Sequence, residues 1–441
     1  MKFNLLLIAT LSILSHGSAT AQIASAQTLI LTSLPETIDK AVKNNPTQAI
    51  YQQQLKQAVY NHRASNGFMY PNISGGFNGQ DNLHLAVTPI PGLLLGKPGT
   101  TYYAQFGKKY AYNTGLTLNE NIFDWSAVLQ SAIAKNNIML TQLQQTAYIQ
   151  SLKDQTAKLY FSILVAKASL KVSTRDLALS DSLVTLSKQR LKEGSTDALS
   201  VNQARINYNN VLQNQAQSQQ LYNQGIENLK IILGETAVTD ISLTAELNID
   251  AINGLDKINM GADKSVEVYR QQLTLSTLQS RAQRSSAYPK LGFDGYVGAQ
   301  QFRDDFGLGF NNDAWSGNRY VGLSLSVPLF TGFTNSNKYK SSLIQQQIAS
   351  MQYKTAREQS AINDKLLLEN YAAYTSMARA SANSYLLYRT NVLLNKAKYQ
   401  EGIINMDVYL KAFEDYLRAE NAHLNNLSQL FSTQATILSR D

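Results

Sequence analysis

Hydrophobic and polar residues alternate in four short segments of the chain. The segments lie near residues 72–80, 110–119, 291–300 and 321–327. A period of two predicts a β-strand with one apolar and one polar face. In the second and fourth segments, the apolar positions are Tyr110, Tyr112, Leu116 and Leu118, and Val321, Leu323, Leu325 and Val327.

Strands of about ten residues that are apolar on one face only are typical of outer-membrane β-barrels. A single strand of this kind would more often belong to a soluble sheet. Four such strands with aromatic residues near their ends favour a membrane barrel, whose lipid-facing side chains would be the eight apolar residues above. Four strands are too few to close a barrel, and an open edge in lipid leaves backbone groups unpaired. Closure therefore requires several chains, and three chains would supply twelve strands.

Two long segments, from Trp125 to Lys192 and from Thr334 to Tyr399, contain neither Pro nor Gly. At 1.5 Å per residue, each would form a helix of about 100 Å. A heptad seam in the first segment alternates large and small residues, which predicts coiled-coil packing. Its members are Ile163, Leu170, Leu177, Val184 and Leu191, with Ala166, Ser173, Ser180 and Ser187 between them. The other faces carry mainly Asn, Gln, Ser and Thr, and would line water or meet bulk solvent.

The sequence also repeats itself on a large scale. The segment from Tyr51 to Leu55 recurs from Tyr269 to Leu273, and a Tyr-Pro pair precedes the first strand of each half. This favours one duplicated unit over separate domains. We expect a first repeat over 22–233, an equatorial connection over 234–262 and a second repeat over 263–441. The fold class is then mainly α, with paired strands and long helical hairpins in each half.

Residues 1–21 have the pattern of a secretory signal peptide. Lys2 is followed by an apolar run from Leu5 to Ile13 and by a small-residue cleavage site at Ala19 to Ala21, with a second possible site after Ala26. The run is too short to span a membrane as a helix. The chain is therefore expected to leave the cytoplasm.

The composition offers little chemistry. The chain has no Cys, and its four His are isolated, so neither a metal site nor a thiol nucleophile is expected. The segment from Gly92 to Lys97 lacks the spacing of a phosphate-binding loop. The net charge of +8 is scattered over a chain that is only 16% charged, which argues against nucleic acid. The sequence predicts no enzyme and no cofactor.

Both long helices run into a Glu-Gly pair, Glu193-Gly194 and Glu401-Gly402. Gly is frequent just after a helix end, so a simple turn is one interpretation of these residues. The helices match in length, however, which places both turns at one level, farthest from the strands. Asp407 and Lys411 lie one helical turn apart, a spacing that allows an ion pair between them.

The signal peptide, the duplicated strand pairs, the two long Gly-free helices and the Glu-Gly turns together resemble the TolC-like outer membrane efflux proteins. The resemblance covers nearly all of the mature chain, and includes the segment from Val327 to Phe333 after the last strand. It implies a homotrimer in the outer membrane of a Gram-negative bacterium, with a twelve-stranded barrel, a periplasmic helical tunnel and an equatorial belt. It also implies docking to a periplasmic adaptor and an inner-membrane pump, in drug or metal efflux or in type I secretion.

On this resemblance, the helical tips would form the gate and the adaptor contact. The predicted residues are Lys192, Glu193, Gly194, Ser195, Thr196, Asp197, Ser200, Glu401, Gly402, Asn405, Asp407 and Lys411. The best-known members carry a second acidic residue where this chain has Leu410 followed by Lys411. The sequence therefore does not decide whether an acidic ring surrounds the mouth. The rival interpretations are a periplasmic adaptor, which would have a single hairpin, and a structural coiled-coil protein of the envelope.

Overall fold

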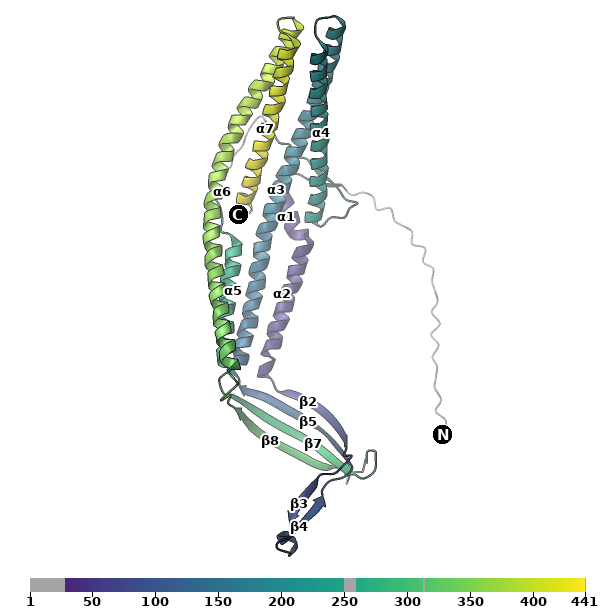
Figure 1. Ribbon diagram of the computed structural model, residues 1–441, viewed down its shortest axis with the longest axis vertical. Helices are drawn as coiled ribbons and strands as arrows, with labels where there is room; N and C mark the ends of the chain where they lie inside the picture. The colour runs from purple at the N-terminus through teal and green to yellow at the C-terminus, as the bar shows by residue number, and fades with distance from the viewer. Residues whose placement is uncertain (1–27, 250–258, 312–313, 441) are drawn as a thin grey trace, which may run out of the picture.

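The computed structural model describes residues 28–249, 259–311 and 314–440. The molecule is a long rod of helices with a β-sheet at one end (Figure 1). A two-stranded ribbon extends beyond the sheet, and two helical turns form the opposite end of the rod. The predicted signal peptide, 1–21, lies outside the described residues.

Seven α-helices form the rod. Two antiparallel hairpins consist of α3 (Trp125–Lys192) with α4 (Ala198–Leu233), and of α6 (Thr334–Gln400) with α7 (Met406–Leu438). The shorter helices are α1 (Leu34–Asn44), α2 (Pro46–Ser65) and α5 (Lys264–Ser285). Helix α2 lies along the sheet-proximal half of α3, and α5 lies likewise along α6 (Figure 1). The two long helices predicted from the absence of Pro and Gly are confirmed.

The same junction closes each half of the rod. In the first half, the Asn45 amide between α1 and α2 donates to the Ile232 carbonyl at the end of α4, at 2.9 Å. A Cβ atom on Gly234 would lie 2.6 Å from the Asn44 carbonyl oxygen. In the second half, a Cβ atom on Gly261 would lie 2.1 Å from the Arg440 carbonyl oxygen after α7. Backbone segments therefore meet closely at both junctions, as a duplicated architecture requires.

The heptad seam of α3 is buried at Ile163 and Val184, half-buried at Leu170 and Leu177, and exposed at Leu191 next to the tip. Ile163 is fully buried, and a Cβ atom on Gly225 of α4 would lie 2.6 Å from its Cγ1 atom. The small seam residues, which let the helices approach, are also buried: Ala166, Ser173, Ser180 and Ser187. Val184 of the seam also belongs to an apolar core near the tips, together with Tyr385, Tyr409, Phe413 and Tyr416.

Four antiparallel strands form the main sheet in the order β2-β5-β7-β8. They are β2 (Asn72–Asp81), β5 (Tyr110–Phe123), β7 (Lys290–Arg303) and β8 (Ser316–Ser326). A second, two-stranded parallel sheet pairs β1 (Thr28–Leu31) with β6 (Asp240–Leu243). It packs beside α1 and α3 through the buried side chains of Leu31 and Leu243, so the first and middle parts of the chain meet on the side of the rod.

The sequence at about 87–101, between the first two strands, is rich in Gly and Pro, which favours a long loop. It instead contributes to a ribbon of β3 (Val87–Pro91) and β4 (Thr101–Gln105). Pro89 and Pro91 are two residues apart, so their nitrogens point to the same side of β3. The next backbone N–H, that of Gly92, donates to the Thr100 carbonyl at 2.7 Å. The two Pro nitrogens thus occupy the outward positions of an edge strand, where no hydrogen is needed.

Candidate functional site

The strand register gathers the apolar residues of all four strands on one face of the main sheet. Leu116 lies opposite Gly75 and Val297, while Phe293 lies opposite Leu323. Directly opposed residues of antiparallel strands share a face. The alternation noted in the sequence therefore gives one continuous apolar face and one face of Asn, Ser, Thr, Gly and Tyr. The predicted residues of the apolar face are Tyr110, Tyr112, Leu116, Leu118, Val321, Leu323 and Leu325; Val327 follows the end of β8.

The apolar face is exposed along the edge strand β8 and covered at its outer end. Val321, Leu323 and Leu325 are 75%, 70% and 68% exposed. Tyr112 differs, because it is only 8% exposed and its hydroxyl accepts a hydrogen bond from the Gly307 N–H at 3.1 Å. The loop between β7 and β8 thus covers this predicted lipid-facing side chain.

The two turns at the far end of the rod have the same geometry. Gly194 and Gly402 adopt left-handed φ angles of 68° and 71°. In each turn, the residue after the Gly donates its N–H to a carbonyl five residues earlier: Ser195 to Arg190, and Ile403 to Lys398, both at 2.9 Å. This is the Schellman arrangement that favours Gly after a helix. The turns lie side by side at one level (Figure 1).

The first helical turns of α4 and α7 are linked by side chains. Asp197 caps α4 by accepting the Ser200 N–H at 2.9 Å, which lowers the pKa of its carboxyl. The Ser200 hydroxyl donates to Asp407 Oδ1 of α7 at 2.8 Å. One turn further on, the Gln203 amide donates to Glu414 Oε1 at 2.6 Å. The structure thus brings predicted tip residues of both repeats into direct contact.

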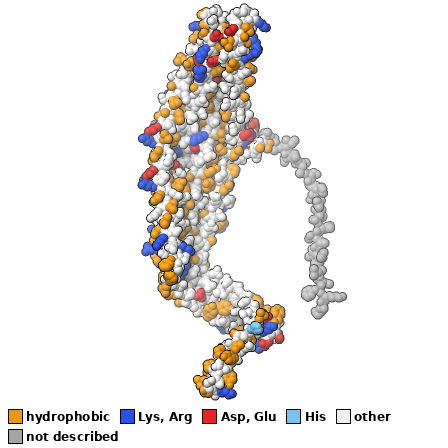
Figure 2. All heavy atoms as spheres, in the orientation of Figure 1, with side chains coloured by type: hydrophobic (Ala, Val, Ile, Leu, Met, Phe, Trp, Pro, Cys, Tyr) orange, Lys and Arg blue, Asp and Glu red, His pale blue; other side chains and the backbone are white. Residues whose placement is uncertain are grey.

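The ion pair that the sequence spacing allows between Asp407 and Lys411 is absent from the described structure. The Lys411 ammonium instead lies 3.1 Å from Asp415 Oδ1, four residues along α7. Arg418 approaches the same carboxylate at 3.4 Å. The remaining predicted residues lie at the ends of α3 and α6 and in the two turns: Lys192, Glu193, Thr196, Glu401 and Asn405. Charged side chains gather at this end of the molecule (Figure 2).

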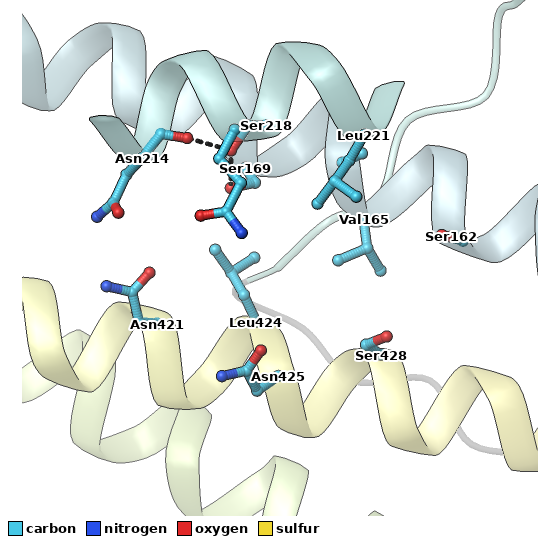
Figure 3. Close-up of a pocket in the computed structure, with 12 residues that line it drawn as sticks. Ser162, Val165, Ser169, Asn214, Ser218, Leu221, Asn421, Leu424, Asn425 and Ser428 are labelled. Atoms are coloured by element: carbon cyan, nitrogen blue, oxygen red, sulfur yellow. Dashed lines mark hydrogen bonds between the residues drawn. The ribbon is translucent and has the colours of Figure 1, made fainter. Parts of the chain in front are cut away.

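A polar cleft of about 210 Å³ separates α7 from α3 and α4 farther down the rod. Asn214 of α4 and Asn421 of α7 face one another across it (Figure 3). On the side of α3 and α4, the Ser169 and Ser218 hydroxyls are 2.8 Å apart. The sequence showed only that these faces are amide-rich. The composition did not indicate that two such faces are opposed, because the contact joins different hairpins.

Within the described ranges, no helix is both long and apolar enough to cross a membrane. The same ranges hold no cluster of three or more His, Asp or Glu side chains placed to bind a metal ion.

The arrangement of paired strands and long helical hairpins, repeated in each half, defines a class of envelope protein. The chain belongs to the outer membrane efflux protein family, whose model matches residues 37–235 and 262–439. This membership confirms the family predicted from the sequence and the prediction that the chain is not an enzyme.

Individual relatives agree with this assignment. The outer membrane protein TolC of Vibrio cholerae is 23% identical over 325 residues, which are 70% of this chain and 69% of that protein. The crystal structure of CusC has a TM-score of 0.73 at 18% identity and covers 95% of this chain and 94% of its own. The CmeC outer membrane channel of Campylobacter jejuni has a TM-score of 0.74 at 15% identity, over 92% of this chain and 85% of its own. These likenesses confirm the predicted fold.

Proposed function

We propose that this chain is the outer-membrane exit duct of a tripartite efflux system or a type I secretion system. The observation that carries the proposal is the main sheet, with its exposed apolar face, its polar opposite face and two unpaired edges. Unpaired strand edges are costly in lipid. Three copies would close a twelve-stranded barrel with the apolar face towards lipid and the polar face towards a water-filled lumen.

The helical hairpins would extend this lumen into the periplasm. Helix α3 has 68 residues and would reach about 100 Å. The predicted repeats, 22–233 and 263–441, would each contribute one hairpin, and 234–262 would form the equatorial connection. The tips, with charged side chains and matched turns, would form the gate and the contact for a periplasmic adaptor. The duct itself would be passive, with energy from an inner-membrane pump.

The experiment is to purify the chain from membranes in mild detergent and measure its mass by light scattering. A particle of about three times the 48.8 kDa chain mass, after correction for detergent and the signal peptide, is expected. The same sample should carry ion current across a planar bilayer. A stable monomer, or a trimer without current, would contradict the duct.

The rival interpretations predict different results in a second test. An integral barrel stays in the membrane fraction after a wash at high pH, whereas a peripheral coiled-coil protein is released. A periplasmic adaptor would have one helical hairpin, and two hairpins are present here.

A further inference from the structure

A cluster of buried polar side chains joins α3 to α7 between the cleft and the tips. Asp176 of α3 is 1% exposed and Glu420 of α7 is 6% exposed. Both carboxyls surround one phenol: the Tyr416 oxygen lies 2.5 Å from Glu420 Oε2, and 3.1 Å and 3.2 Å from the two oxygens of Asp176. Two buried acids from different hairpins therefore share a single hydroxyl.

The hydrogen atoms in this cluster are too few for two ionised carboxylates. Tyr416 has one hydroxyl hydrogen and can give it to only one of the two acids. Arg175 donates through Nη2 to the Tyr416 oxygen at 2.7 Å, and reaches Asp176 Oδ1 only through a long Nε contact of 3.5 Å. A buried carboxylate without a partner is costly. One added proton, held by the two carboxyls, would remove the excess negative charge.

Charged groups of α3 and of the connection after β6 lie beside the cluster. On α3, Arg175 is half-exposed and its Nε atom is 3.5 Å from Asp176 Oδ1. The connection after β6 brings Glu246, which pairs with Lys171 of α3 at 3.0 Å. Helix α4 has no charged residue between Arg205 and Glu227.

Helices α6 and α7 add aromatic and cationic groups beside the cluster. The Arg389 guanidinium of α6 lies over the Tyr385 ring, 5.7 Å from its centroid. The His423 ring of α7 stacks on the same Tyr385 ring, and the His423 Nε2 atom is 2.7 Å from the Ile249 carbonyl oxygen. Arg175 itself contacts both Asp176 and the Tyr416 hydroxyl.

The electrostatics agree with the geometry. Burial, followed by the neighbouring Asp176 carboxyl, raises the pKa of Glu420 to about 8. Burial also raises the pKa of Asp176. Both shifts favour a proton on the pair at neutral pH and its loss in alkaline solution.

The cluster lies between the two helical hairpins and close to their tips. Asp176 lies 16 residues before the end of α3, or about 24 Å from the tip. Tyr416 belongs to the apolar core near the tips, where it packs against Phe413 and Tyr385. The acids thus lie between the first hairpin and the second, which must shift against each other if the mouth is to open.

We propose that one proton, bound jointly by Asp176 and Glu420, locks the first helical hairpin against the second, and that its loss at alkaline pH loosens them. When the proton leaves for water, two adjacent carboxylates face each other with one hydroxyl hydrogen between them. Their repulsion and their need for water would separate α3 from α7. The link to opening of the mouth rests on the proposed duct.

The test uses the full-length protein in detergent and compares it with Glu420→Gln, which keeps a neutral hydrogen-bonding side chain. Infrared difference spectra should show one protonated carboxyl per chain disappearing with a midpoint near pH 8, and this signal should be absent in Glu420→Gln. Asp176→Asn serves as a second variant if the first fails to assemble. Asp415→Asn removes another acid of α7, one that is half-buried and pairs with Lys411 and Arg418; it is the matched control and should titrate like the original protein.

Amide hydrogen exchange tests the lock itself. At pH 6, α3 and α7 should exchange at the same rate in the original protein and in Glu420→Gln; at pH 9, exchange should be severalfold faster in the original protein. Absence of a carboxyl titration between pH 6 and pH 9, or identical exchange in both proteins at pH 9, would overturn the proposal. A trimer that titrates and loosens as expected but carries no ion current would support the lock and contradict the duct.

Discussion

Ser200 and Asp407 join the two repeats at the tip of the rod, where the Ser200 hydroxyl donates to the Asp407 carboxylate at 2.8 Å. Ser200 lies six residues after Gly194, and Asp407 lies five residues after Gly402. The bond therefore connects nearly equivalent positions of a duplicated chain. Hydrogen bonds to a charged acceptor are stronger than neutral ones. A movement that separates α4 from α7 at the tip has to break this bond.

Replacing Ser200 with Ala should loosen the tip. Loss of one hydrogen bond to a carboxylate should lower the free energy of unfolding by about 1–2 kcal/mol. A double-mutant cycle of Ser200→Ala and Asp407→Ala, measured by thermal unfolding in detergent, should give a non-zero coupling energy. In a planar bilayer, each variant should be open for a larger fraction of time.

Leu199→Ala is the matched control, since this neighbouring side chain is 72% exposed. It should leave both the unfolding midpoint and the current unchanged. Additive effects of Ser200→Ala and Asp407→Ala would show that the bond does not hold the tip in solution.

The helices and strands could be predicted because local patterns determine them. The absence of Pro and Gly places α3 at Trp125–Lys192, the same limits as in the structure. The period-two alternation places the apolar residues of four strands on one face. The ribbon of β3 and β4 escaped prediction because a segment rich in Gly and Pro, with Pro89 and Pro91, favours a loop. Their compatibility with an edge strand depends on which side of the ribbon carries the hydrogen bonds.

The side-chain contacts of the site depend on tertiary structure and could be predicted only in part. The turns and their Gly residues follow from sequence, but the partner of Lys411 does not. Both Asp407 and Asp415 lie four residues from it, and α4 decides the choice by bringing Ser200 to Asp407. Asp176 and Glu420 belong to helices far apart in the chain, so nothing local signals that they meet.

The next prediction concerns which face of the main sheet contacts lipid and which contacts water. Leu325 belongs to the apolar face and Ser324 to the polar face of β8. Leu325→Arg should destabilise the assembled barrel by about 2–4 kcal/mol if it lies near the midplane of the membrane. Ser324→Arg, the adjacent control, should be milder because its side chain would point into water. The measurement is the fraction of heat-dissociable trimer in membranes, and equal losses in both variants would mean that the faces are misassigned.

Charge at the tips should control block by cations. Lys411→Glu adds negative charge near Asp407 and also removes the ion pair of Lys411 with Asp415. We expect stronger block of single-channel current by a trivalent cation, with trimer assembly unchanged. Asp407→Ala should weaken the block.

Lys365→Glu provides the control for the Lys411 variant, because Lys365 is an exposed residue of α6 far from the tips. It produces the same change of charge and should leave the block as it is. Unchanged conductance and block in both tip variants would place the constriction elsewhere along the rod.

The buried acid pair predicts a stability that falls as pH rises. Folding raises the pKa of Glu420 from 4.5 to about 8, so above pH 4.5 the folded chain holds a proton that the unfolded chain has released. This stabilisation is complete below pH 4.5 and is lost as pH rises to about 8, at about 1.4 kcal/mol for each pH unit. Glu420→Gln cannot titrate, so its unfolding midpoint, followed by circular dichroism in detergent, should fall less steeply between pH 5 and pH 8. The control Asp415→Asn should keep the slope of the original protein, and a Glu420→Gln slope as steep as the original would show that this carboxyl is ionised throughout.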